Sequence, residues 1–63
     1  MDIAKNIKSR RLALGISQCD LAKEVGVTQA MICQIERGSK VPTLPLSKEI
    51  ANVLKCKVDD LAV

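Results

Sequence analysis

The sequence predicts an all-α fold, a compact bundle of five short helices. No segment alternates apolar and polar residues as a half-buried strand would, whereas apolar residues recur at helical spacing in several short windows. Glycine and proline separate those windows, and these residues commonly end or begin helices. The 63 residues include no aromatic side chain, so the chain is expected to form one small domain, residues 1–63, with an aliphatic core.

The first helix is expected over about residues 3–14. Ile3, Ile7 and Leu14 recur along one side of it at helical spacing. Asp2 precedes the helix as a candidate N-cap, and Gly15 follows it as a stop. This helix should therefore pack an apolar stripe on the core.

Two more helices are expected on either side of Gly26. Ser17 and Asp20 have the spacing of a capping box that opens the first of them. Thr28 can cap the other, which runs to about Arg37 before Gly38 stops it. Their inward residues are Leu21, Ala22, Val25, Ile32 and Ile35.

Two prolines, Pro42 and Pro45, break the chain and open a fourth helix, because proline is tolerated only in a helix's first turn. Its apolar stripe is Leu46, Ile50, Val53 and Leu54. A last helical turn around residues 59–62 would place Val58 and Leu61 on the core. The linking loops of about two to seven residues suit an all-α domain.

Residues 17–38, hereafter the reading segment, have the pattern of a helix-turn-helix that fits the DNA major groove. Ala22 is small where a crossing helix must come close. Gly26 stands where the chain needs a left-handed residue to turn sharply. Apolar residues on both sides of that turn hold the two helices together.

The outward side of the second of these helices carries no carboxylate. Once the inward isoleucines are removed, the remaining residues are Thr28, Gln29, Ala30, Met31, Cys33, Gln34 and Arg37. A surface that approaches phosphates should avoid negative charge, and glutamine can bond adenine at N6 and N7 while threonine or alanine contacts the thymine methyl. An ordinary solvated polar face is the alternative interpretation.

The charge is distributed unevenly along the chain. Residues 1–42 hold seven lysines and arginines against four carboxylates, whereas residues 43–63 hold three of each. The excess of positive charge thus lies with the reading segment and the helix before it, as expected of a phosphate-facing surface.

Arg11 and Glu36 each lie at the edge of an expected buried face. An unpaired buried charge is costly, so we expect the two to form an ion pair that joins the first helix to the end of the reading segment. Separate exposure of both side chains to solvent is the alternative.

Several other classes of protein find little support. No apolar run is long enough to span a bilayer and no signal peptide is evident, so the expected location is cytoplasmic. With no histidine, no clustered carboxylates and no phosphate-binding glycine loop, neither an enzyme nor a cofactor is expected. Cys19, Cys33 and Cys56 form no C-x-x-C pair and are expected to be structural thiols rather than metal ligands.

With these features the chain resembles the Xre/Cro/C1-type helix-turn-helix family, which includes the DNA-binding domains of lambdoid-phage repressors and Cro proteins. The resemblance runs from about Ile7 to Leu61. It is carried by Arg11, Gly15-Ile16-Ser17-Gln18, Leu21-Ala22, Gly26-Val27-Thr28, Ile32, Ile35-Glu36-Arg37-Gly38, Pro42, Ala51, Leu54 and Leu61.

The resemblance implies a five-helix domain that binds double-stranded operator DNA, usually as a homodimer on a two-fold site. It implies base contacts by Thr28, Gln29, Ala30 and Gln34. It implies phosphate contacts by Ser17 and Gln18 and by Arg37 and Lys40, which flank the loop that meets the DNA backbone. The family's internal ion pair corresponds to Arg11 and Glu36.

The chain departs from the family's pattern at several positions. Cys19 and Cys33 replace residues that are usually polar. Ser47 stands where a large aliphatic residue is common, so the core is expected to be thinner there. Lys55-Cys56-Lys57 replaces a typical Gly-Val-Ser, and loss of that glycine leaves open the conformation of this turn and any dimer contact it makes.

The leading hypothesis is a sequence-specific DNA-binding transcriptional regulator, and a repressor in particular, because repression needs only occupancy of a promoter. One alternative is an antitoxin-type interaction module of the same fold that neutralises a toxin partner. Another is a redox-gated regulator in which Cys33, on the reading face, acts as the switch.

Overall fold

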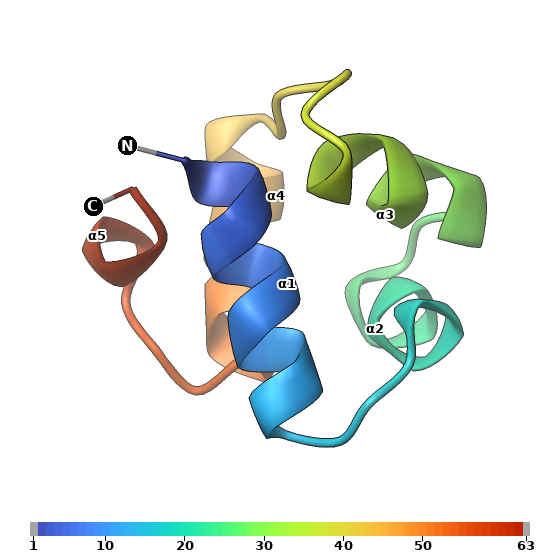
Figure 1. Ribbon diagram of the computed structural model, residues 1–63, viewed down its shortest axis with the longest axis horizontal. Coiled ribbons are helices and arrows are strands. Elements are labelled where there is room, and N and C mark those ends of the chain that lie inside the picture. Colours follow the sequence, from blue (N-terminus) through green and yellow to red (C-terminus); the bar gives the residue numbers. More distant parts are fainter. Residues whose placement is uncertain (1, 63) are drawn as a thin grey trace.

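The computed structural model describes residues 2–62, which contain five helices and no strand, as predicted. The helices are α1 (Ile3–Ala13), α2 (Gln18–Val25), α3 (Gln29–Glu36), α4 (Leu44–Val53) and α5 (Val58–Leu61). In Figure 1, α1 crosses the front of the molecule and α4 lies behind it, with α2 and α3 on one side and α5 on the other. No helix in this part of the chain has both the length and the apolar character needed to cross a membrane.

Side-chain caps explain where the helices begin. The carboxylate of Asp2 accepts from the backbone N–H of Lys5, and Ser17 and Asp20 form the predicted capping box at the start of α2. Thr28 caps α3, also as predicted. The start of α4 depends on Thr43, whose hydroxyl accepts from the backbone N–H of Leu46, as well as on the prolines from which this start is predicted. Each such cap typically contributes about 1 kcal/mol.

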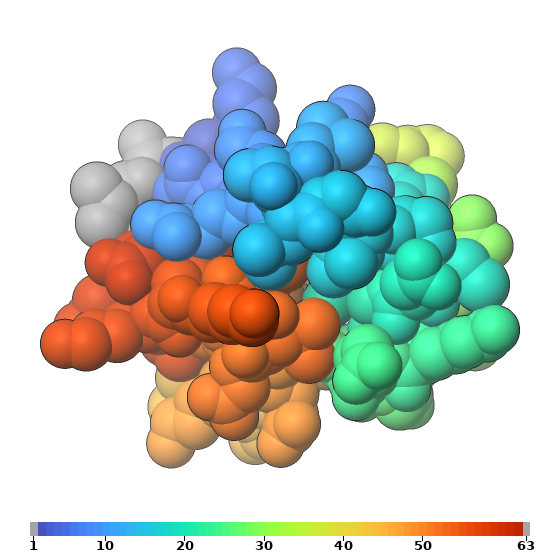
Figure 2. Space-filling model, turned by 90° about the horizontal axis from the view of Figure 1, so that it is seen from below, coloured from blue at the N-terminus to red at the C-terminus, as the bar shows by residue number. Residues whose placement is uncertain are grey.

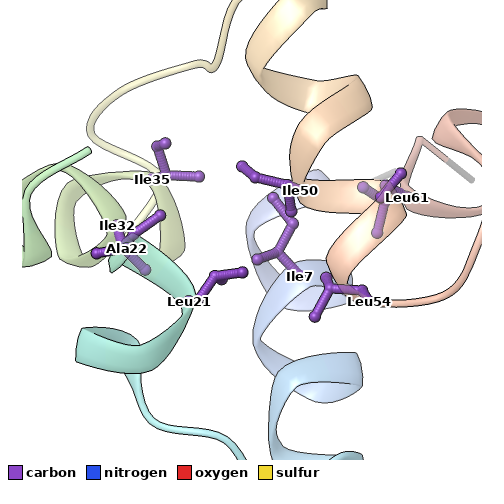
Figure 3. Close-up of a cluster of buried hydrophobic side chains, with 9 residues drawn as sticks. Ile7, Leu21, Ala22, Ile32, Ile35, Ile50, Leu54 and Leu61 are labelled. Carbon is purple, nitrogen blue, oxygen red and sulfur yellow. The ribbon is translucent and has the colours of Figure 1, made fainter. Parts of the chain in front are cut away.

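An aliphatic cluster lies where the five helices meet (Figure 3). Its fully buried large side chains are Ile7, Leu21, Ile32, Ile35, Ile50 and Leu61. The two helices at the ends of the chain are also joined directly, because the side-chain amide of Asn6 donates to the backbone carbonyl of Leu61 at 2.8 Å. The core therefore contacts both helices of the reading segment and holds them against α1 and α4.

The predicted stripe of α1 is wrong at its C-terminal end. Leu14 is 42% exposed, and the buried residues of α1 are Ala4, Ile7 and Arg11. Helical spacing does place Leu14 on the same side as Ile7, but α1 ends at Ala13 and Leu14 lines a shallow surface hollow instead of the core. On α4, Ser47 is buried where a larger side chain was thought typical, so the core there contains a small polar residue.

The turn between α4 and α5 takes the conformation that glycine would favour. Lys55 has φ of 58° and is the only non-glycine residue with positive φ among residues 2–62. The backbone N–H of Cys56 donates to the carbonyl of Ala51 at 3.0 Å, so α4 ends in a Schellman-type motif with lysine at the left-handed position. A side chain in this conformation costs about 1 kcal/mol relative to glycine.

Replacing Lys55 by glycine should therefore stabilise the fold. We expect Lys55→Gly to raise the free energy of unfolding by about 0.5–1 kcal/mol, since relief of backbone strain exceeds the added entropy of the unfolded chain. Chemical denaturation monitored by circular dichroism measures the change. Lys57→Gly is the control at a residue with extended backbone, φ −93°, and should not stabilise. A destabilised Lys55→Gly protein would contradict the assignment of strain to this turn.

Candidate nucleic-acid interface

The angle between α2 and α3 is set by a tight turn at Gly26. Gly26 has φ of 76°, and the backbone N–H of Val27 donates to the carbonyl of Ala22 at 2.9 Å. Ala22 itself is 3% exposed. The small side chain and the left-handed glycine therefore do what the sequence predicted, and α3 leaves the turn packed against α2.

The exposed side of α3 is narrower than predicted. Thr28, Gln29, Ala30 and Gln34 are all exposed, but Met31 and Cys33 are partly buried. Met31 packs against the core cluster, so it belongs to the inner side of the helix and the prediction that it lies on the outward side is wrong. In a helix of only eight residues, periodicity is a poor guide to whether a residue at the boundary faces the core or the solvent. The remaining exposed groups of α3 are amides, a hydroxyl and a methyl, all of which can contact base edges.

The four residues expected to contact phosphates lie at two places. Ser17 and Gln18 stand at the start of α2, where the helix dipole favours an anion and the carboxylate of Asp20 already lies in the same first turn. Arg37 and Lys40 are exposed at the end of α3 and in the loop that follows it. Thus both flanks of the reading segment carry groups that suit phosphate oxygens.

Around α3 and the loop that follows it, the surface is uniform in electrostatic character, whereas the start of α2 also carries the exposed carboxylate of Asp20. Between residues 25 and 48 the only carboxylate is that of Glu36, and its side chain is 2% exposed. Arg37, Lys40 and Lys48 are exposed cations in the same stretch. From the turn at Gly26 to the second turn of α4, the surface therefore presents positive and neutral polar groups without exposed negative charge.

Arg11 and Glu36 are joined by the ion pair expected of them. Arg11 Nε and Nη2 donate to Glu36 Oε2 at 2.7 Å and Oε1 at 3.0 Å. The third nitrogen, Nη1, donates to the backbone carbonyl of Ile16 at 2.9 Å. The hydrogen bond to Glu36 raises the pKa of Arg11 although its burial acts in the opposite direction, so the guanidinium stays charged at any ordinary pH.

Gln18 also donates to Glu36, a contact that sequence reasoning missed. Its side-chain Nε2 lies 3.1 Å from Glu36 Oε1, and the glutamine is partly buried rather than fully exposed. We call Arg11, Gln18, Glu36 and the carbonyl of Ile16 the Glu36 cluster. No periodicity could have indicated this bond, because it joins the first residue of α2 to the last residue of α3 across 18 positions.

The three cysteines are free thiols at separate places in the fold. Cys19 is exposed, whereas Cys33 and Cys56 are partly buried. Burial raises the pKa of the Cys56 thiol, with Arg10 opposing the shift, so this thiol is less readily ionised than a free one. Residues 2–62 hold no cluster of three or more histidine, cysteine or carboxylate side chains suited to a metal.

A different face of the molecule carries a shallow hollow of about 480 Å³ (Figure 2). Figure 2 looks onto the place where the α1–α2 loop, α2 and the end of α4 meet. Apolar Leu14, Ile16 and Val53 line the hollow together with charged residues of both signs, Asp20, Lys23, Glu24 and Lys55. The mixed charge distinguishes this face from the carboxylate-free side of α3.

Comparison with known proteins agrees with the geometry. A helix-turn-helix family model matches residues 7–61. A transcriptional regulator of the HTH type from Archaeoglobus fulgidus is 37% identical over 57 residues, which cover 90% of this chain and 81% of that protein. Another, from Methanothermobacter thermautotrophicus, is 42% identical over 48 residues, covering 76% and 70%.

Solved structures give the same result. The P22 c2 repressor in complex with a synthetic operator matches with a TM-score of 0.92 and 33% identity, covering 97% of this chain and 92% of that one. The DNA-binding domain of the same repressor in solution matches with a TM-score of 0.95 and 32% identity, covering 98% and 82%.

The ion pair provides a direct test of what holds the reading segment in place. Glu36→Gln removes the charge that compensates Arg11, whose side chain is 8% exposed, and should lower the free energy of unfolding by about 3–5 kcal/mol. Chemical denaturation monitored by circular dichroism measures this loss. Glu24→Gln, which removes an exposed carboxylate of α2, is the control and should change stability by no more than about 0.5 kcal/mol. Equal losses of stability in the two variants would show that the ion pair contributes no more to the free energy of unfolding than an exposed carboxylate does.

Proposed function

The chain belongs to the helix-turn-helix family, and from this we propose that it is a transcriptional regulator that binds double-stranded operator DNA through the major groove. Residues 1–63 would act as one DNA-binding domain. The observation that carries the proposal is the exposed side of α3, which presents Gln29 and Gln34 on a surface without exposed carboxylates. The similarity to a repressor bound to its operator supports the same function and favours it over an antitoxin.

We propose that four side chains of the reading segment contact base edges. Gln29 and Gln34 have the amide groups that can bond adenine at N6 and N7. Ala30 and the methyl of Thr28 can contact the thymine methyl. The Thr28 hydroxyl accepts from the backbone N–H of Met31, which leaves its hydrogen free to donate to DNA.

Phosphate contacts would hold α3 in the groove from both sides. At the start of α2, the Ser17 hydroxyl accepts from Asp20 and keeps its own hydrogen for a phosphate oxygen, and Gln18 keeps one of its two amide hydrogens. Beyond α3, the positively charged side chains of Arg37 and Lys40 would contact phosphates of the DNA backbone. These contacts fix orientation and carry no sequence information of their own.

Useful affinity calls for two copies on one operator. The domain measures 24 × 23 × 19 Å, so one copy covers little more than one half-site. Two half-sites about 34–36 Å apart, one helical turn, would accommodate two copies side by side. A homodimer bound in this way at a promoter would repress transcription by occupying it. Binding to operator DNA would place the protein in the cytoplasm.

The base contacts can be tested at single positions. Gln34→Ala should weaken binding to the preferred duplex by about 1–3 kcal/mol and relax the preference at one base pair, and Gln29→Ala should do so at another. Fluorescence anisotropy with the preferred duplex and single-base variants of it measures both effects. A Gln34→Ala protein with an unchanged preference would remove Gln34 from the reading face.

The phosphate contacts have a different signature. Lys40→Ala should weaken binding to every duplex alike and reduce the slope of log K against log salt by about one, because one fewer counterion is released. Titrations between low and moderate salt measure the slope. Lys23→Ala, an exposed lysine of α2 beside the hollow, is the matched control and should leave the slope unchanged. The assignment of Lys40 fails if both variants behave alike.

A further inference from the structure

The hollow beside α2 combines an apolar floor with a rim that carries charges of both signs. Leu14, Ile16 and Val53 supply the floor, and Leu14 is 42% exposed although it is a large aliphatic side chain. In Figure 2, α2 and the end of α4 flank the hollow together with the α1–α2 loop. No residue of α3 lines it, so the proposed base contacts leave this face unused.

The positive and negative charges of the rim come from different elements. Asp20 and Glu24 lie about one turn apart on α2 with Lys23 between them, so α2 contributes an excess of negative charge. Lys55, in the turn after α4, contributes a positive charge. No ion pair within residues 2–62 involves any of these four side chains. All four charges are therefore available to a partner.

The lysine on the α4 side of the rim is held in a strained conformation. Lys55 has φ of 58°, in the left-handed region that glycine favours. Strained residues of this kind are concentrated at positions where proteins bind something. Glycine would relieve the strain but would also remove the only charge that the α4 side gives to the hollow. The lysine thus lowers the stability of the fold and adds a charge to this face.

We propose that the face around the hollow is a self-association surface, at which two copies of this chain pair about a two-fold axis. In such a contact each patch meets the same patch of the other copy. Leu14 of each copy enters the hollow of the other, where apolar side chains cover it. Lys55 of each copy faces Glu24 of the other, so the rim is complementary to itself.

A rim of mixed charge is less suited to other occupants. The carboxylates of Asp20 and Glu24 repel DNA, and a partner of uniform charge is repelled by one part of the rim. A second copy carries both signs, in positions that the two-fold axis exchanges. Because the exposed side of α3 stays free in both copies, this pairing goes beyond the proposed function and does not depend on it.

Sedimentation velocity of the DNA-free protein over a wide range of concentration tests the pairing. We expect a shift from monomer to dimer at high micromolar concentrations, because a contact centred on one shallow hollow is small and such contacts are weak. Lys55→Glu and Glu24→Lys should each raise the dissociation constant about tenfold, and the double variant should restore it. Lys48→Glu, the same charge change at an exposed lysine of α4 outside the hollow, is the control and should leave the dimer unchanged.

Two further variants separate pairing from effects on the fold. Leu14→Gln should weaken the dimer, whereas Leu12→Gln should not, since Leu12 is 58% exposed on α1 but does not line the hollow. Lys55→Gly should weaken the dimer although it stabilises the fold. A purely structural role for Lys55 would not give these opposite changes.

The proposal fails if the protein remains monomeric at its highest soluble concentration. It also fails if the variants at the hollow leave a dimer intact, or if the double charge reversal does not restore pairing. Those results leave operator binding standing, because no DNA is present in the measurement. A protein that pairs as expected but enriches no sequence from a random DNA pool supports the pairing and overturns the proposed function instead.

Discussion

The architecture of this domain depends on one buried carboxylate. Glu36 closes α3 and accepts hydrogen bonds from Arg11 of α1 and Gln18 of α2. Through the third nitrogen of Arg11 the α1–α2 loop is attached as well. The core has no aromatic side chain, and its isoleucines and leucines pack α2 and α3 against each other beside the turn at Gly26. The directional bonds of the buried ion pair add a further constraint to this packing.

The same carboxylate explains how a surface without negative charge coexists with a stable fold. Glu36 is the only acid between residues 25 and 48, and the ion pair takes it out of solvent. The exposed side of α3 is left to neutral polar groups, and the cations Arg37 and Lys40 follow it. Placing the acid inside therefore serves both the fold and the surface that we propose faces phosphates.

The elements could largely be predicted from the sequence because their signals are local. Caps at Asp2, Ser17 and Thr28 and the stop at Gly26 depend on residues within one helical turn, and the structure has all of them. The prediction from helical periodicity that Leu14 lies in the core is wrong. Periodicity shows on which side of a helix a residue lies, but it does not show where along the helix the core ends.

The bond from Gln18 to Glu36 and the left-handed Lys55 could not be predicted in the same way. The first depends on how two helices lie relative to each other, and the second on a turn where lysine replaces the expected glycine. The predicted exposed side of α3 wrongly includes Met31, which lies at the boundary between the two sides and packs against the core.

The central claim is that the exposed side of α3, held by the Glu36 cluster, is the surface that meets DNA. Nuclear magnetic resonance of the labelled protein, titrated with the duplex it prefers, tests this most directly. The account predicts that the largest amide and side-chain shifts fall at the start of α2, along Gln29 to Gln34 and in the loop through Lys40. Shifts concentrated around the hollow formed by Leu14, Ile16 and Val53 would contradict it.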